Sequence, residues 1–287
     1  MPAEIIDGSQ LARSIRKEVR RQVRKLKFTP GLAVVQVGDD PASTIYINLK
    51  QKDCKLVDLH SEVYCLPERT PQEDVIDQIH SLNSRKDIHA ILVQMPVPEQ
   101  IDGQTVIDEI APEKDVDGLG IANLGNLLIN RESVLPCTPA GIMRLIESTG
   151  VEIEGRRAVC VGRSSLVGKP VGLMLLNRNA TVTYCHSRTR ALTQETRNAD
   201  ILVAAVGKPL MIKADMVKPE AIVIDVGINR VNDRLIGDVD FAGVEEVAGF
   251  ITPVPGGVGP MTRAMLLENT LKLARVQEHG AKPPRSN

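Results

Sequence analysis

Short runs of hydrophobic residues alternate along the chain with longer stretches of helical periodicity. Each run has about the length of a β-strand and contains mainly valine, isoleucine, leucine and alanine. The runs span residues 32–37, 88–93, 157–161, 181–184, 201–206 and 221–226. Continuous apolar strands separated by helices are typical of a mainly parallel sheet that helices cover on both faces. The pattern therefore predicts an α/β fold built from layered βα units.

Two longer stretches carry a hydrophobic stripe at helical spacing. The stripe of the first consists of Leu11, Ile15, Val19, Val23 and Leu26. The opposite face of this stretch is basic and is interpreted as a solvated helix face. Its basic residues are Arg13, Arg16, Lys17, Arg20, Arg21, Arg24, Lys25 and Lys27. The second stretch runs from Arg263 to Val276, and its stripe consists of Leu266, Leu267, Thr270, Leu271, Leu273 and Ala274.

The segment Pro253–Thr262, just before the second stretch, contains three prolines and three glycines within ten residues. Proline fixes φ and glycine lacks a Cβ, so such a segment combines rigidity with close approach of the backbone to a flat ligand. We expect a shaped loop over the whole segment, with Thr262 as the N-cap of the helix that follows. Taken alone, such a segment is more often a structural turn than a binding site.

Length and composition narrow the class of protein. With 287 residues, 43% of them hydrophobic, the chain is long enough for two domains of ordinary size. A net charge of −1 and an aromatic content of 2% argue against nucleic-acid binding by basic surfaces or by base stacking. No apolar run approaches the roughly 20 residues of a membrane-spanning helix. We therefore expect neither a nucleic-acid partner nor a membrane partner.

The five cysteines are scattered and have no histidine at metal-binding spacing, so no metal site is predicted. An odd number of separate cysteines is typical of reduced thiols in an intracellular protein. The N-terminus lacks the basic and apolar regions of a secretory signal. These features predict a cytoplasmic protein.

A glycine-containing loop follows the predicted strand at residues 157–161. The loop runs from Gly162 to Gly172 and leads into a helix. A helix N-terminus offers free N–H groups to a pyrophosphate, so this order of elements predicts a dinucleotide-binding unit. The spacing departs from G-x-G-x-x-G because Ser164 occupies the place of the second glycine. By spacing alone, a plain turn between strand and helix explains the loop equally well.

The choice between NADP and NAD depends on the end of the next strand. An NAD site usually places a carboxylate there, about 20 residues after the glycines, to bind the ribose 2′-hydroxyl. The corresponding segment, Tyr184–Arg188, contains no carboxylate. Ser187 and Arg188, together with Arg163, offer donors for a 2′-phosphate instead, which favours NADP. NAD stays the lesser alternative.

Tyr46 and Lys50 lie four residues apart on a predicted helix that begins after Pro41, so their side chains share one face. Taken alone, a tyrosine and a lysine at this spacing are most often an ordinary surface pair. Short-chain dehydrogenases carry a similar pair, but theirs follows the glycine loop, whereas this pair precedes Gly162. The order of the motifs therefore argues against that class of enzyme.

Several segments together resemble the methylenetetrahydrofolate dehydrogenase/cyclohydrolase family. The resemblance extends from about Ile5 to about Val276. Its most specific segments are Gln94–Pro98, Lys114–Gly118, Pro136–Pro139 with Gly141, Gly162–Pro170 and Pro253–Thr262. Met95 and Val97 stand where leucines are usual, a conservative change that leaves Gln94 intact.

The resemblance implies a role for particular residues. It implies catalytic roles for Tyr46, Lys50 and Gln94. It implies substrate binding by Tyr46, Asp117, Pro255, Gly256 and Gly257. It implies NADP binding by Gly162, Arg163, Ser164, Ser187, Arg188 and Ile228, the last within the strand-end segment Asp225–Asn229. The implied substrates are one-carbon derivatives of tetrahydrofolate, and the implied assembly is a homodimer.

These residue types suit the chemistry of the family. A carboxylate accepts both donors on the guanidine-like edge of a pterin, so Asp117 fits the role of anchor, with Asp115 as the alternative. Lys50 is the candidate for hydrolysis, because partial burial near a cationic substrate lowers the pKa of a lysine. Hydride transfer between two flat rings needs stacking rather than a strong base, and we expect Pro253–Thr262 to enforce that stacking.

The predicted organisation is two layered α/β domains with the active-site cleft between them. Residues 1–120 plus 262–287 are expected to form the folate-binding catalytic domain, with the last helix assigned to it by the resemblance. Residues 121–261 are expected to form a Rossmann-like NADP-binding domain. Two other functions stay open, which are an NAD(P)-dependent oxidoreductase without cyclohydrolase activity and a non-catalytic dinucleotide-binding regulator.

Overall fold

The computed structural model describes residues 2–232 and 234–279, and it divides into two compact units. The three-stranded unit comprises residues 14–137 and the described residues from 263 on. The six-stranded unit comprises residues 2–13 and the described residues of 138–262. The divisions fall inside three helices, which are α1 (Gly8–Val23), α6 (Cys137–Ser148) and α10 (Val258–His279).

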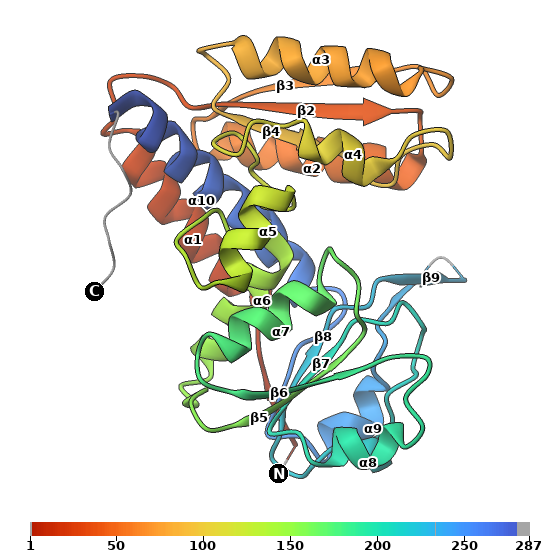
Figure 1. Ribbon diagram of the computed structural model, residues 1–287. Helices are drawn as coiled ribbons and strands as arrows, with labels where there is room; N and C mark the ends of the chain where they lie inside the picture. The colour runs from red at the N-terminus through yellow and green to blue at the C-terminus, as the bar shows by residue number, and fades with distance from the viewer. Residues whose placement is uncertain (1, 233, 280–287) are drawn as a thin grey trace. The chain divides into compact units, whose positions relative to one another are not determined.

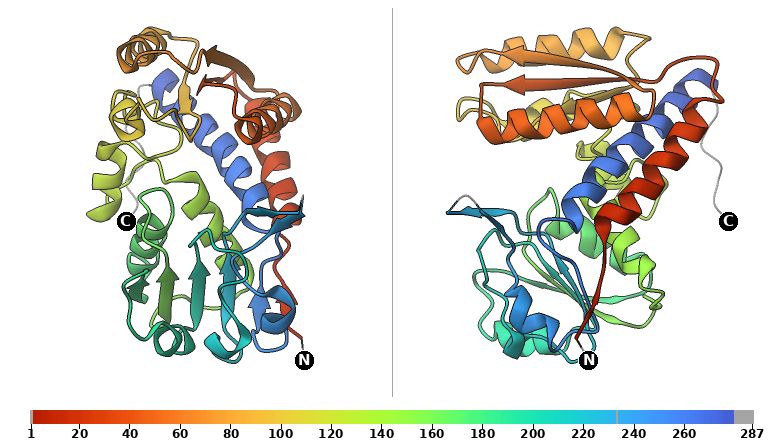
Figure 2. Two further views of the ribbon diagram at one scale, coloured as in Figure 1. Left: turned by 90° about the vertical axis from the view of Figure 1, so that its right-hand side faces the viewer. Right: turned by 180° about the vertical axis from the view of Figure 1, so that it is seen from behind.

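The three-stranded unit is a parallel sheet in the order β3-β2-β4 (Figure 1). Its strands are β2 (Gly31–Val37), β3 (His60–Leu66) and β4 (Ala90–Val93). Its own helices are α2 (Pro41–Leu56), α3 (Gln72–Ser84), α4 (Gly103–Asp108) and α5 (Ile121–Leu128). The view along the strands shows α3 and α4 on one face of the sheet and α2 on the other (Figure 2). Every residue of the central strand β2 is buried, because helices cover both of its faces.

The core of this unit lies between the sheet and the helices α3 and α4. Alternate residues of β2 contact the buried stripe of α3, which is Val75, Ile79 and Leu82. The parts of helices α1 and α10 that belong to this unit run side by side (Figure 2), and Arg275 Nη1 on α10 donates to Gln22 Oε1 on α1 at 2.7 Å. The predicted stripe of α10 is buried throughout, whereas in the stripe of α1 only Val19 and Val23 are fully buried.

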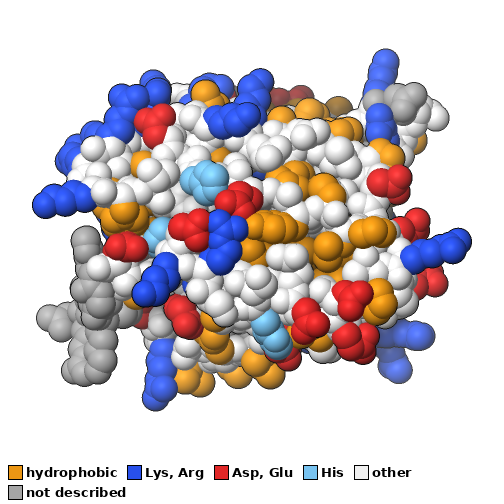
Figure 3. Space-filling view, turned by 90° about the horizontal axis from the view of Figure 1, so that it is seen from above, with side chains coloured by type: hydrophobic (Ala, Val, Ile, Leu, Met, Phe, Trp, Pro, Cys, Tyr) orange, Lys and Arg blue, Asp and Glu red, His pale blue; other side chains and the backbone are white. Residues whose placement is uncertain are grey.

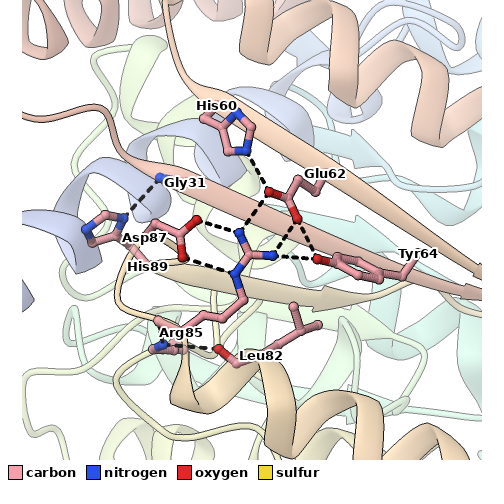
Figure 4. Close-up of polar contacts among 9 residues, drawn as sticks. Gly31, His60, Glu62, Tyr64, Leu82, Arg85, Asp87 and His89 are labelled. Atoms are coloured by element: carbon pink, nitrogen blue, oxygen red, sulfur yellow. Dashed lines mark hydrogen bonds and ion pairs between the residues drawn. The ribbon is translucent and has the colours of Figure 1, made fainter.

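Strand β3 is an edge of the sheet and was not among the predicted strands. It begins with three polar residues, His60, Ser61 and Glu62, and none of its residues is fully buried, so it lacks the long hydrophobic run that marked the others. An ion-pair cluster lies at this edge (Figure 4). Arg85 donates to both carboxylate oxygens of Glu62, at 2.7 and 2.9 Å, and also pairs with Asp87. His60 and Tyr64 contact the same Glu62 carboxylate. Glu62, on the edge strand, therefore interacts with Arg85, His60 and Tyr64.

The six-stranded unit contains a parallel sheet in the order β1-β11-β8-β7-β5-β6. Its strands are β1 (Glu4–Ile5), β5 (Arg157–Val161), β6 (Thr181–Cys185), β7 (Ile201–Ala204), β8 (Ile222–Asp225) and β11 (Phe250–Ile251). Its other elements are α7 (Gly168–Leu176), α8 (Leu192–Arg197), α9 (Phe241–Glu245), the 3₁₀ turn Ala214–Met216 and the hairpin β9 (Asn229–Val231) and β10 (Arg234–Ile236). Each predicted hydrophobic run contains or overlaps one strand of the two sheets, which confirms the α/β prediction.

The strand order changes direction at β5. The chain passes from β5 to its neighbour β6 on one side, and then to β7 on the other side of β5. All neighbouring pairs in this sheet are parallel, so the carboxyl ends of the strands share one edge. In open α/β sheets ligands bind at this edge, beside the strand where the order reverses. The loops after β5 and β7 therefore border the expected ligand crevice.

The compact units divide the chain at residues 13, 137 and 262, whereas the predicted domains divide it at 120 and 262. Residues 2–13 group with the six-stranded unit because β1 pairs with β11. Residues 121–137 group with the three-stranded unit, where Asn123 donates to Asp115. The assignment of a folate domain and an NADP domain to these units stays a prediction.

The loop prediction for Pro253–Thr262 is right for its first half and wrong for its second. Helix α10 begins at Val258, so Thr262 lies in the helix and is not its N-cap. Pro260 sits in the first turn, where its missing N–H would have had no helical partner. Thr262 Oγ1 instead lies 2.9 Å from Thr138 Oγ1.

Neither positive nor negative side chains dominate the face of the molecule seen in Figure 3. Basic, acidic and hydrophobic side chains are mixed there. This mixture agrees with the net charge of −1. Among the helices of residues 2–232 and 234–279, none is both long and apolar enough to cross a bilayer.

Candidate active site

Lys50 and Gln94 meet in the three-stranded unit. Lys50 comes from the middle of α2, which begins at Pro41 with Asp40 as its N-cap, and Gln94 directly follows β4. Lys50 Nζ donates to Gln94 Oε1 at 2.8 Å, and Gln94 Nε2 donates to the Met95 carbonyl at 2.7 Å. The amide of Gln94 is therefore oriented by the backbone, and it fixes the position of the Lys50 side-chain nitrogen.

The surroundings of Lys50 favour its neutral form. Burial lowers the pKa of Lys50, and the charge of Arg263 acts in the same direction, while the carboxylate of Asp117 opposes both. Tyr46 lies one helical turn before Lys50, and burial raises the pKa of its hydroxyl, so the hydroxyl keeps its proton. The pair therefore offers a lysine able to accept a proton beside a hydroxyl able to donate a hydrogen bond.

The two candidate pterin anchors have different surroundings. Asp115 is 1% exposed and accepts hydrogen bonds from the N–H groups of Gly118, Leu119 and Gly120 and from Asn123 Nδ2. These four donors use the acceptor positions of Asp115 to shape the turn that follows it. Asp117 is only half-buried and its charge reaches Lys50. The Cys137 thiol is a hydrogen-bond partner of Asp117, so the two carboxylates differ in the number of donors that they accept.

Cys137 and Asn269 support the segment that carries Asp117. Asn269 on α10 donates from Nδ2 to the carbonyls of Val116, at 2.9 Å, and Leu135, at 3.0 Å. The same Nδ2 lies 3.4 Å from Cys137 Sγ. Burial, followed by the charge of Asp117, raises the pKa of the Cys137 thiol well above its usual range. The thiol is therefore uncharged beside Lys50.

Arg263 is a further cation near Tyr46 and Lys50. Its Nη1 lies 3.3 Å from Asp53 Oδ2, and Arg16 Nη1 lies 3.8 Å from the other oxygen of the same carboxylate. Asp53 is one turn beyond Lys50 on α2, so this ionic triad ties the helix of the candidate site to α1 and α10.

The predicted cofactor residues lie in the six-stranded unit, at the carboxyl edge of its sheet. Gly162 follows β5 with φ of 126°, and a Cβ there would lie 2.1 Å from the Ala205 carbonyl. Glycine is therefore required where the loops after β5 and β7 cross. Ser164 Oγ accepts from the Val167 N–H at 3.2 Å, which closes the turn before α7. This side chain takes over part of the loop-shaping role of the missing second glycine.

Ser187 and Arg188 are both exposed in the turn after β6. The turn is closed by hydrogen bonds from the His186 N–H to Thr189 Oγ1 at 2.9 Å and from the Arg188 N–H to His186 Nδ1 at 3.1 Å. Arg163, in the loop after the neighbouring strand β5, is exposed as well. The three residues that are predicted to donate hydrogen bonds to the 2′-phosphate thus lie in adjacent loops at one edge of the sheet.

The remaining predicted residues also lie at strand ends. Ile228 is 48% exposed in the loop after β8. The loop of Pro255, Gly256 and Gly257 follows β11. Gly257 N–H donates to the Pro253 carbonyl at 2.8 Å, and Ser9 Oγ donates to the Gly256 carbonyl at 3.3 Å. This loop is therefore braced by the start of α1, which the sequence did not predict.

Two sequence profiles match the chain. Residues 6–117 match the catalytic domain of tetrahydrofolate dehydrogenase/cyclohydrolase, and residues 136–278 match its NAD(P)-binding domain. The chain belongs to this family. The resemblance inferred from the motifs is thereby confirmed. One profile covers Lys50 and the other covers the glycine loop, and both describe the same family.

Full-length relatives agree with the profiles. The bifunctional protein FolD of Moorella thermoacetica is 56% identical over 279 residues, which cover 96% of this chain and 100% of the relative. The bifunctional FolD of Campylobacter jejuni has a solved structure with a TM-score of 0.94 at 43% identity, covering 95% of this chain and 99% of that one. The Trypanosoma brucei enzyme, solved with NADP and an inhibitor, gives a TM-score of 0.92 at 38% identity, covering 96% and 98%.

Sequence reasoning missed several residues that shape the site. Cys137 lay inside a matched segment, Pro136–Pro139, but nothing in its spacing revealed the contact with Asn269. Asn269 and Arg263 sit on a helix whose hydrophobic stripe pointed only to packing. The loop after β7 carries no motif, and only the strand order places it at the ligand edge.

Proposed function

We propose that this chain oxidises 5,10-methylenetetrahydrofolate to the 5,10-methenyl cation with NADP and then hydrolyses that cation to 10-formyltetrahydrofolate. The observation that carries the proposal is the bond from Lys50 Nζ to Gln94 Oε1 at 2.8 Å in a family whose members are named for both activities. A dehydrogenase alone needs no such lysine, because hydride transfer moves no proton.

Lys50 is proposed to act in the hydrolytic step. Water adds its oxygen to the bridging carbon of the cation and loses one proton. The C–N bond to N5 then breaks as N5 gains a proton, while the remaining hydroxyl proton is released to solvent and the formyl C=O bond forms. A neutral lysine accepts the first proton and returns it in the second step. Burial, which lowers the pKa of Lys50, supports this role, and Gln94 orients the amine toward the reacting atoms.

Asp117 is proposed to bind the pterin and Tyr46 to lie against the substrate. Asp115 already accepts four hydrogen bonds, whereas Asp117 is half-buried and has the Cys137 thiol as a partner, so the Asp117 oxygens suit the paired N–H donors of a pterin edge. On the other unit, Pro255, Gly256 and Gly257 are proposed to contact the substrate through a loop with little side-chain bulk.

NADP is proposed to lie across the carboxyl edge of the six-stranded sheet. When bound, it supplies the nicotinamide that accepts the hydride. Gly162 and Ser164 shape the loop at the N-terminus of α7, where backbone N–H groups suit a pyrophosphate. Arg163, Ser187 and Arg188 are proposed to bind the 2′-phosphate, and Ile228 to contact the cofactor. The lack of a carboxylate in Tyr184–Arg188 supports NADP over NAD.

A homodimer and the absence of a metal requirement complete the proposal. Sedimentation of the purified chain would give its mass in solution, with twice the 31.2 kDa of one chain expected. Activity that survives a chelator would be expected as well, because the proposed chemistry uses side chains and NADP.

The deciding experiment is an absorbance assay with methylenetetrahydrofolate and either NADP or NAD, which follows reduced cofactor and methenyl product together. We expect NADP to be reduced while methenyl product does not accumulate, because hydrolysis removes it. Accumulating methenyl product would contradict the hydrolytic role, and reduction of neither cofactor would contradict the proposed function as a whole.

A further inference from the structure

Two buried carboxylates of the six-stranded unit have no part in the site described so far. Asp225 ends β8 and is 3% exposed, while Asp238 follows β10 and is fully buried. A buried carboxylate is costly unless hydrogen-bond donors surround it. The donors that surround these two come from the loops at the ligand edge of the sheet.

Asp238 binds three consecutive backbone N–H groups in the loop after β7. Its Oδ2 accepts from Val206 at 2.6 Å and from Gly207 at 2.9 Å, and its Oδ1 accepts from Lys208 at 2.9 Å. Successive N–H groups that converge on one anion form a nest. Here the anion is part of the protein, so the side chain fixes the conformation of Val206–Lys208.

Asp238 also reaches the loop that carries Ile228. Asn229 Nδ2 donates to Asp238 Oδ1 at 2.9 Å and to the Ile236 carbonyl at 3.2 Å. Asn229 is the residue directly after Ile228. One carboxylate therefore links the loop after β7 to the loop after β8.

Asp225 holds Asp238 in place from the neighbouring strand end. Its Oδ1 accepts from the Asp238 N–H at 2.9 Å, and its Oδ2 accepts from the Val239 N–H at 3.0 Å. A Cβ at Gly237 would lie 1.8 Å from Asp225 Oδ2, so only glycine lets the segment come this close. Asp225, at the end of β8, thus positions Asp238, and Asp238 in turn positions the two loops.

The loop after β7 lies next to the glycine loop that is predicted to bind the cofactor. Strand β7 is the neighbour of β5 at the point where the strand order reverses, and the Ala205 carbonyl touches Gly162 of the glycine loop. The loop after β7 therefore borders the crevice in which a dinucleotide binds in this fold. Gly207 and Lys208 are exposed there.

We propose that Asp238 is a positioning residue for NADP, which shapes Val206–Lys208 and the Ile228 loop into one cofactor-facing surface. This proposal rests on the proposed function. A carboxylate is required because all four donors need an acceptor. An asparagine has one acceptor oxygen and turns two donors of its own toward the N–H groups, which leaves them unsatisfied.

The test compares Asp238→Asn with the unaltered chain in the two half-reactions. Hydrolysis of methenyltetrahydrofolate, measured without NADP, reports the folate side and the integrity of the chain. Dehydrogenase activity as a function of NADP concentration reports the cofactor side. We expect the KM for NADP to rise about 10-fold or more, as one to two lost charged hydrogen bonds would produce, while hydrolysis changes less than about two-fold. An unchanged KM, or an equal loss of both activities, would overturn the proposal.

A readout independent of activity is amide hydrogen exchange in the protein without cofactor. The amides of Val206, Gly207 and Lys208 are expected to exchange faster in Asp238→Asn, whereas those of strand β5 are expected to keep their protection. Asp240→Asn is the matched control, because Asp240 is a partly exposed carboxylate nearby that forms an ion pair with Lys213. Uniformly faster exchange would show a stability role instead.

Asn229→Ala decides the case if Asp238→Asn does not fold. Asn229 is half-buried and contributes one of the four donors, so its loss leaves the nest intact. We expect NADPH, titrated by its fluorescence, to bind several-fold more weakly. Unchanged NADPH binding would overturn the proposal. A lack of dehydrogenase activity in the unaltered chain would instead contradict the proposed function.

Discussion

Lys50 Nζ donates a hydrogen bond to Gln94 Oε1 at 2.8 Å, which joins helix α2 to the end of strand β4. Burial lowers the pKa of Lys50, and Gln94 offers an acceptor to the amine without adding a charge that would raise that pKa. A neutral acceptor is what a lysine needs if it is to act as a base. A carboxylate in the place of Gln94 would hold the lysine in its charged form.

Replacement of Lys50 is expected to abolish hydrolysis. In Lys50→Ala the rate of methenyltetrahydrofolate hydrolysis should fall by about 100-fold or more, because a positioned base contributes about that factor. Lys52→Ala, an exposed lysine on the same helix, is the matched control and should keep the full rate. Hydrolysis that survives in Lys50→Ala would remove Lys50 from the reaction.

The pH dependence of hydrolysis should report the charge of Asp117. The Asp117 carboxylate raises the pKa of Lys50 against the effect of burial. Asp117→Asn removes that charge, so the pKa of Lys50 falls and the neutral lysine persists to lower pH. The acidic limb of the hydrolysis rate at saturating substrate should move to lower pH. A shift to higher pH would mean that the limb belongs to another group.

Replacement of Asp117 should weaken substrate binding, whereas replacement of Asp115 should lower the stability of the fold. Asp117→Asn is expected to raise the KM for folate substrates in both half-reactions with little change in Tm. Asp115→Asn leaves several buried N–H groups without an acceptor and should cost about 1–3 kcal/mol of folding free energy. Thermal unfolding together with KM measurements on both variants checks this. A large KM effect confined to Asp115→Asn would make Asp115 the anchor.

The sequence predicted most of the strands because a buried parallel strand needs a continuous hydrophobic run. It missed β3, whose edge position lets the strand begin with three polar residues, and it missed the short strands β1, β9, β10 and β11. It also placed the start of α10 too late, at Arg263. Proline in the first turn of a helix resembles proline in a loop when only the residue types are known.

The residues of the candidate site that belong to recognisable motifs could be predicted from the sequence. Residues that contact the site from distant parts of the chain could not. Lys50 and Gln94 belong to recognisable segments, and the structure brings them together. Asn269 supports the Asp117 segment from more than a hundred residues further along the chain. Such a contact depends on how α10 packs, which periodicity alone does not reveal.

Arg188 should discriminate between the two nicotinamide cofactors. If it binds the 2′-phosphate, Arg188→Ala should raise the KM for NADP by about 10-fold or more and leave that for NAD unchanged, because a charged hydrogen bond contributes about 1.5–3 kcal/mol. Arg190→Ala, an exposed arginine two residues on, is the control. Equal effects on both cofactors would place Arg188 elsewhere than at the 2′-phosphate.

The Glu62 cluster should stabilise the edge strand β3 in a pH-dependent way (Figure 4). Hydrogen bonds from Arg85, and then from His60 and Tyr64, lower the pKa of Glu62 to about 2. A carboxylate whose pKa is lowered by folding stabilises the protein above its ordinary pKa near 4.5, and the effect is lost as pH falls from there toward 2. Glu62→Gln should therefore be less stable than the unaltered chain at pH 7, and the difference should shrink as pH falls below 4.5. Glu62 is partly exposed, so solvent limits the effect to about 1 kcal/mol, or about 2–4 °C in Tm.

The control for this prediction is Glu109→Gln, because Glu109 forms a single exposed pair with His80. Its Tm should change by less than about 1 °C at either pH, as isolated surface pairs contribute little. Thermal unfolding of both variants at pH 7 and pH 4 measures the comparison. A Tm difference for Glu62→Gln that stays constant between these pH values would mean that packing, and not the charge of Glu62, holds this edge.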